Sequence, residues 1–113
     1  MKLSKSTIIT VPATPGGTAI GDQATLRGKK LRGIVALAGN HPDGRALVAP
    51  ATAYLTLARA GGELIQDDLP MAILLPSANG GLLQEFGDET VDWTKSSVKA
   101  LPAGLVAFSV IYE

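Results

Sequence analysis

Residues 53–76, AYLTLARAGGELIQDDLPMAILLP, carry the strongest structural signal in the chain. Residues 54–60 are rich in strand-favouring side chains, and residues 63–66 can run back alongside them. The glycines at 61–62 can supply the two positive φ angles of a tight reversal. Residues 69–76 add a short apolar run with a proline at each end, which no solvated loop would favour. The stretch therefore predicts a β-hairpin that packs against the rest of the chain.

The first and last strands are predicted at residues 6–11 and 105–112. Residues 6–11, STIITV, are mostly β-branched. In residues 105–112, one face carries Val106, Phe108, Val110 and Tyr112, and the other carries Leu105, Ala107, Ser109 and Ile111. One face is bulky and the other is still largely apolar. We therefore expect this strand at the centre of a sheet, covered on both sides.

Another strand is predicted at residues 30–38. Leu31, Val35 and Leu37 share one face at a period of two residues. Gly33 lies on the same face, where a glycine is typical of a bulge or of a close neighbour.

These elements predict an all-β fold. Turn signals occur at residues 39–45 and 77–81, and residues 46–50 could form a short edge strand. The fold class is a single-domain antiparallel β-sandwich or jelly-roll-like barrel of about seven or eight short strands, spanning residues 1–113. Residues 1–17 could form an N-terminal arm that contacts a neighbouring subunit.

The composition restricts the class of protein. A chain of 113 residues suits one domain that buries roughly two-thirds of its unfolded surface. Thirteen glycines and seven prolines disfavour long helices, and the absence of cysteine excludes disulfides and thiolate metal sites. No run approaches the ~20 apolar residues of a membrane span or resembles the core of a signal peptide. We expect the protein to be assembled in the cytoplasm.

Charge is distributed unevenly, although the formal net charge is zero. Residues 1–59 hold eight basic and two acidic side chains, whereas residues 60–113 hold two basic and eight acidic ones. Such asymmetry is typical of a basic and an acidic face that meet within one molecule or between copies. The alternative is that interleaved strands mix the two halves in space.

The densest basic segment, RGKKLR, contains Arg27, Lys29, Lys30 and Arg32. These cations could contact nucleic acid phosphates without sequence specificity. Because no aromatic residue lies nearby for base stacking, a solvated strand entry or an inter-subunit ion-pair site is the better interpretation. The four residues are therefore candidate interface residues.

Asp67, Asp68, Asp92 and Trp93 complete the candidate interface. Acidic residues at 67–68 and 85–92 could supply oxygen ligands to calcium, but their spacing matches no EF-hand loop, and solvated charges or partners for basic residues are the better interpretation. Trp93, the only tryptophan, could stack on a sugar. A half-buried anchor at the sandwich edge or a subunit interface is the commoner role for such a residue.

No catalytic constellation is evident in the sequence. His41, the only histidine, lies in a turn where an exposed position is expected, and no local residue forms an acid–base pair with it. The glycines lie in hairpin-type turns and match neither a phosphate-binding loop nor a dinucleotide fingerprint. We expect no enzymatic activity, no cofactor and no metal ion.

Four segments together resemble a known class of protein: YLTL at 54–57, ELIQDDLPM at 63–71, VDWTKS at 91–96 and VAFSVIY at 106–112. In their pattern and order they are similar to small β-barrel structural proteins of bacteriophage virions. Capsid proteins of tailless icosahedral phages are the nearest, and decoration proteins of tailed phages are a second possibility. The resemblance implies a single-barrel coat, vertex or cement subunit without an active site.

Two functions follow as hypotheses. The first is a structural subunit of a virus particle, assembled in the host cytoplasm, which forms homo-oligomers and contacts other shell proteins. The second is a ligand-binding or glycan-binding, adhesin-like β-module that uses Trp93 and the acidic loops.

Overall fold

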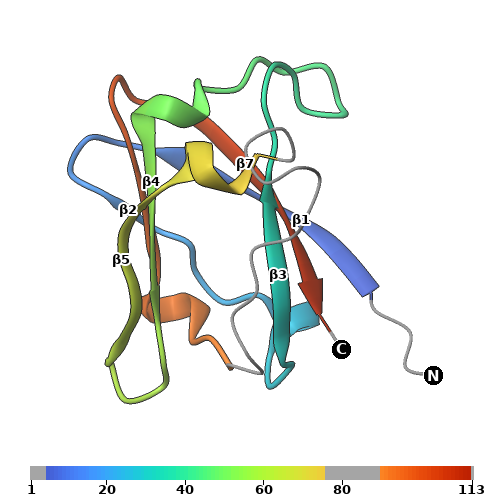
Figure 1. Ribbon diagram of the computed structural model, residues 1–113, viewed down its shortest axis with the longest axis vertical. Helices are drawn as coiled ribbons and strands as arrows, with labels where there is room; N and C mark the ends of the chain where they lie inside the picture. Colours follow the sequence, from blue (N-terminus) through green and yellow to red (C-terminus); the bar gives the residue numbers. More distant parts are fainter. Residues whose placement is uncertain (1–4, 76–89, 113) are drawn as a thin grey trace.

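Two antiparallel β-sheets pack face to face in the computed structural model, which describes residues 5–75 and 90–112 (Figure 1). The strands are β1 (Lys5–Ala13), β2 (Thr18–Ala19), β3 (Leu31–Ala36), β4 (Ala53–Ala58), β5 (Leu64–Pro70), β6 (Ser97–Ala100) and β7 (Gly104–Tyr112). One sheet has the order β1-β7-β3 and the other the order β2-β6-β4-β5. The short 3-10 helices are η1 (Ala24–Leu26), η2 (Pro50–Thr52), η3 (Met71–Leu74) and η4 (Trp93–Lys95). The predicted all-β sandwich is confirmed, and no helix in the described ranges is long and apolar enough to cross a membrane.

The strand β7 lies at the centre of the three-stranded sheet, as predicted. It pairs with β1 over nine residues, from Lys5 opposite Tyr112 to Ala13 opposite Gly104, and with β3 on its other side. The side chains of its bulky face, Val106, Phe108, Val110 and Tyr112, are all buried. The opposite face is covered only in part, because Ala107 is buried but Leu105, Ser109 and Ile111 are half-buried.

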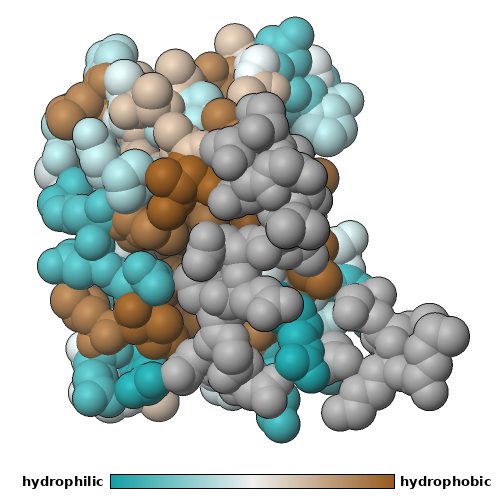
Figure 2. All heavy atoms as spheres, viewed as in Figure 1, coloured by the Kyte–Doolittle hydropathy of each residue, from teal (hydrophilic) through white to brown (hydrophobic). Residues whose placement is uncertain are grey.

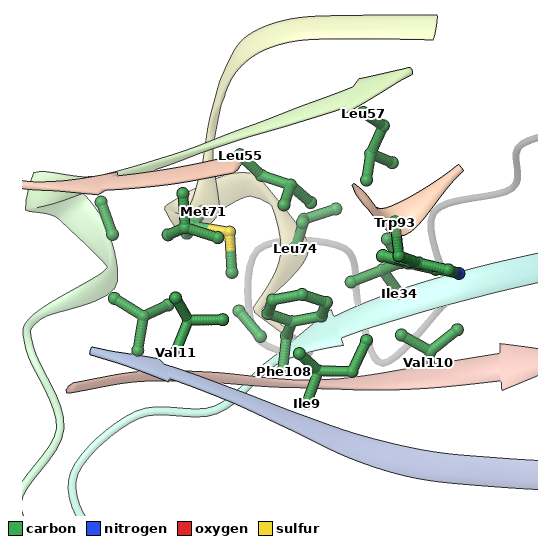
Figure 3. Close-up of a cluster of buried hydrophobic side chains, with 14 of the residues drawn as sticks. Ile9, Val11, Ile34, Leu55, Leu57, Met71, Leu74, Trp93, Phe108 and Val110 are labelled. Carbon is green, nitrogen blue, oxygen red and sulfur yellow. The ribbon is translucent and has the colours of Figure 1, made fainter. Parts of the chain in front are cut away.

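The core lies between the two sheets and is mainly aliphatic (Figure 3). Phe108 of β7 is fully buried and points toward the opposite sheet, where Leu55 and Leu57 of β4 line the core. The ring of Trp93 stacks on the ring of Phe108, with a centroid separation of 6.5 Å and an interplanar angle of 28°. Full burial of each such side chain stabilises the fold by about 1.5–3 kcal/mol.

The hairpin predicted at residues 53–76 is formed by β4 and β5. Its turn is closed by two backbone hydrogen bonds: the Arg59 N–H donates to the Glu63 carbonyl, and the Gly62 N–H donates to the Arg59 carbonyl, both at 2.8 Å. Of the two glycines in this turn, only Gly62 has a positive φ, of 85°, so the expectation of two such angles is wrong for Gly61. The apolar run after β5 forms η3, which buries Met71 and Leu74.

The strand β3 contains the bulge that Gly33 suggested, but its buried face differs from the prediction. Leu31 lies opposite Tyr112 and Gly33 opposite Ile111, so one extra residue is inserted on β3. The insertion inverts the alternation of side chains from that point on. Leu31 is buried as expected, but Ile34 and Ala36 then face the core, while Val35 and Leu37 are half-buried.

One further expectation is corrected. Residues 46–50 do not form a strand: Ala46 makes an isolated bridge with Asn40, and the Val48 N–H donates to the Leu105 carbonyl at 2.8 Å. Residues 5–13, within the segment expected as an N-terminal arm, form β1, which pairs along its whole length with β7 of the same chain. The contact of this segment with a neighbouring subunit stays a prediction. The turn expected at 77–81 lies outside the described residues.

Replacing Gly104 with alanine should destabilise the protein. The added methyl group would overlap Cγ2 of Val48, whose β-branched side chain has little freedom to move aside. We expect the free energy of unfolding in urea to fall by about 1–3 kcal/mol. Gly16→Ala is the control, because nothing lies within 4 Å of its added methyl. Equal stability of the two variants would contradict the packing of Val48 against β7.

Candidate interaction surface

Trp93 belongs to the core and not to a surface. Only 5% of it is exposed. The segment that carries it is held against the end of β4, because the Asp92 N–H donates to the Ala58 carbonyl at 2.8 Å and the buried hydroxyl of Ser96 accepts the Ala58 N–H at 3.1 Å. The prediction of an exposed sugar platform is therefore wrong for this residue, and the anchor expected to be half-buried at the sandwich edge or a subunit interface is almost fully buried.

Asp92 caps η4. Its Oδ1 accepts hydrogen bonds from the hydroxyl of Thr94 at 2.5 Å and from the backbone N–H of Thr94 at 3.0 Å. The hydroxyl bond is the main reason why the pKa of Asp92 is lower than usual. This predicted interface carboxylate therefore has an evident local role at the start of η4.

The basic segment lies between η1 and β3, and its members have different surroundings. Arg27 forms an exposed ion pair with Asp22. Both side chains, with Asp92 and the edge of Trp93, line a surface pocket of about 300 Å³. Lys29 and Lys30 are exposed and line neither this pocket nor the one described below. Arg32 is half-buried at the bulge of β3.

Asp67 and Asp68 lie at a bulge of β5, on the other sheet. The register of β4 on β5 shifts between Leu55 and Leu57, and Asp68 has a φ of 49°, which is uncommon outside glycine. The Asp68 N–H donates to the Thr56 hydroxyl at 3.1 Å, and the Lys99 ammonium donates to the Asp68 carboxylate at 3.2 Å.

A second surface pocket, of about 330 Å³, lies beside this bulge. It is lined by Pro15, Tyr54, Asp68, Lys99 and Leu101. The structure therefore brings Arg27, Asp92 and Trp93 around one pocket and places Asp68 at another.

The strands of the two halves of the chain are interleaved, as the second of the two interpretations of the charge pattern expects. Each sheet contains strands from both halves of the sequence. Three intramolecular ion pairs join residues of the same half, Arg27 with Asp22, Arg45 with Asp43 and Lys99 with Asp68, whereas the pair of Arg59 with Glu63, at the turn between β4 and β5, joins the two halves.

His41 is half-buried and not exposed as predicted. Its Nε2 lies 2.9 Å from the hydroxyl of Thr10 on β1, and its Nδ1 accepts the Asp43 N–H at 3.1 Å. The ring therefore ties the 39–45 loop to the first sheet. In the parts of the chain that the structure describes, no group of three or more His, Cys, Asp or Glu side chains could hold a metal ion.

The edges of the two sheets offer a different kind of surface, which the sequence did not reveal. Large apolar side chains reach solvent at Ile8 on β1, Leu64 on β5 and Leu101 before β7, with 43%, 51% and 50% of each exposed. Figure 2 shows apolar residues in several separate groups on the face it displays. Of these residues, Ile8 lies on the longest edge strand.

The edge strands differ in how well they are protected against pairing with another chain. The strand β5 carries Asp67 and Asp68 at its bulge, β3 is bulged at Gly33 and contacts η3, and β2 has only two residues. Charges, bulges and shortness are the usual devices that block edge-to-edge association. In contrast, β1 is nine residues long, pairs with β7 without a register shift and carries no charge after Lys5.

Comparison with known proteins gives no relative: no family model, no curated protein and no solved structure matches this chain.

Removing the guanidinium of Arg45 should raise the pKa of Asp43. In the folded protein the Arg45 side chain, whose Nε donates to Asp43 Oδ2 at 2.7 Å, is the main cause that lowers this pKa to about 2. Asp43 therefore contributes stability above its unfolded pKa, and this is lost as the pH falls through about 2. In Arg45→Gln, the carboxyl carbon of Asp43 should titrate closer to 3.8 by NMR.

The matched control is Arg27→Gln, because Arg27 pairs with Asp22 and should leave the titration of Asp43 unchanged. A wild-type Asp43 that already titrates near 3.8 would contradict this ion pair.

Proposed function

We propose that this protein is a structural subunit of a virus particle, a capsid, vertex or decoration protein, which acts by self-association and by contacts with other shell proteins. The observation that carries the proposal is the long and unbulged edge of β1, which carries no charge after Lys5 and exposes Ile8. Monomeric proteins usually block such an edge, because its unpaired backbone groups bind other strands. An edge left open suits a protein whose role is to join neighbours.

The assignment to a virus particle rests on the resemblance of about residues 53–112 to small β-barrel virion proteins. A small β-sandwich is the architecture which that resemblance implies, and the described residues have it. Assembly in the host cytoplasm and a non-specific contact between Lys29 or Lys30 and nucleic acid belong to the same proposal, since both lysines are exposed.

The alternative of a glycan-binding module has less support. It depended on Trp93 and the acidic loops, and the ring of Trp93 is buried against Phe108.

Immunogold electron microscopy of virus preparations from the source of this chain tests the proposal. An antibody against the purified protein should label intact particles, and the label should persist after density-gradient purification and nuclease treatment. A protein that is absent from every particle fraction, and is found only in the soluble fraction, would contradict the proposal.

A further inference from the structure

The backbone hydrogen bonds that β7 makes on the side of β3 determine which residues of β1 bond to β7 and which point their backbone groups outward. The carbonyl of Ala107 accepts the Leu37 N–H at 3.1 Å, and the carbonyl of Leu105 accepts the Val48 N–H at 2.8 Å. Both carbonyls therefore point away from β1. In an antiparallel pair, the residues opposite them, Thr10 and Pro12, must occupy non-hydrogen-bonded positions.

Because this alternation continues along a regular pair, the odd-numbered residues of β1 bond to β7, and Ser6, Ile8 and Thr10 direct their N–H and C=O groups outward. Pro12 agrees with this assignment of the even-numbered residues. It has no N–H to donate, and proline in an edge strand occupies positions where the N–H would point away from the neighbouring strand. Thr14 continues the same edge, and its carbonyl accepts the Ala100 N–H of β6 at 3.1 Å. The outward backbone groups of residues 6, 8 and 10 have no partner among residues 5–75 and 90–112.

We infer that β1 pairs with β1 of a second copy, antiparallel and about a two-fold axis at Ile8. In this register Ile8 faces Ile8 of the second copy, and Ser6 faces Thr10 of the second copy. Each facing pair exchanges both backbone hydrogen bonds, so every outward group of these residues is satisfied. The two three-stranded sheets then become one continuous sheet. This inference deepens the proposed function, on which it rests, by naming the self-association surface.

The register of the same strand that is centred on Thr10 is less suitable. A two-fold axis at Thr10 would place Ile8 opposite Pro12, which has no N–H, and Ser6 opposite Thr14, whose carbonyl is already used by β6. In the Ile8 register, Lys5 faces Val11 of the second copy, so no two like charges oppose each other. The interface is isologous, which is the commonest way for identical chains to form closed dimers.

Side chains support the same register. The odd-numbered residues Ile9, Val11 and Ala13 are buried in the core, so the even-numbered side chains lie on the outer face of the sheet. Ile8 is 43% exposed there and would pack against its own copy across the axis, in the place where an aliphatic cross-strand pair is favourable. Pairing would therefore cover one of the exposed large apolar residues of the described chain.

Variants that place a positive or a negative charge at position 8 test the inference. The wild-type protein should be a dimer that dissociates on dilution in analytical ultracentrifugation. Ile8→Lys and Ile8→Glu each place two like charges at the axis, and each should raise the dimer dissociation constant by about tenfold or more. An equimolar mixture of the two variants should recover dimers, because lysine then faces glutamate. Circular dichroism of both variants should match the wild type, since position 8 points to solvent.

Leu64→Lys is the matched control, because it places a lysine at an equally exposed leucine on β5 and should leave the dimer intact. Dimers that persist in both single variants, or a wild type that stays monomeric at every concentration, would overturn the inference. In either case, label on virus particles would show that the proposed function stands without it. Dimers with the expected charge dependence but without particle label would sustain the inference and contradict the function.

Discussion

The register of β1 on β7 is the constraint on which the rest of the molecule depends. Nine consecutive residue pairs fix which side chains of each strand enter the core and which backbone groups remain at the edge. On β7 this register directs Phe108 into the space between the sheets, where it meets Trp93. On β1 it buries Ile9 and Val11 and leaves Ile8 in solvent. The same pairing therefore builds the core and creates the open edge.

Much of the fold could be predicted because its signals are local. The hairpin of β4 and β5 was evident from strand-favouring residues on both sides of two glycines, and the central position of β7 followed from its two apolar faces. The buried face of β3 could not be predicted in full, because the extra residue at the bulge inverts the alternation of buried and exposed side chains. A prediction from strict alternation assumes that no residue is inserted. Gly33 marked the place of this irregularity but not its effect on Val35.

The candidate site could be predicted less well, because its elements depend on contacts between distant segments. Trp93 has charged and polar neighbours in sequence and was expected to be a half-buried anchor, yet its segment is held by hydrogen bonds to Ala58 and its ring enters the core. His41 is half-buried because it packs against Thr10, distant in sequence, whose hydroxyl accepts the Nε2–H of the ring when Nδ1 accepts the Asp43 N–H. No local sequence pattern identified β1 as an open edge strand, because β-branched residues occur both in edge strands and in central strands.

The charge pattern has a simpler role than the sequence suggested. Strands from the two halves alternate in both sheets, and carboxylates pair with cations of the same chain. Association through complementary charged halves therefore has little basis. The proposed pairing through the backbone groups of β1 does not depend on charge, because it needs only another strand in the correct register.

Amide hydrogen exchange along β1, followed by NMR, tests the central claim most directly. In dilute protein the amides of Thr7, Ile9 and Val11, which bond to β7, should exchange slowly, and those of Ser6, Ile8 and Thr10 should exchange fast. At high concentration the second set should also become slow. Slow exchange of the even-numbered amides in dilute protein, or their continued fast exchange in a sample shown to be dimeric, would contradict the account.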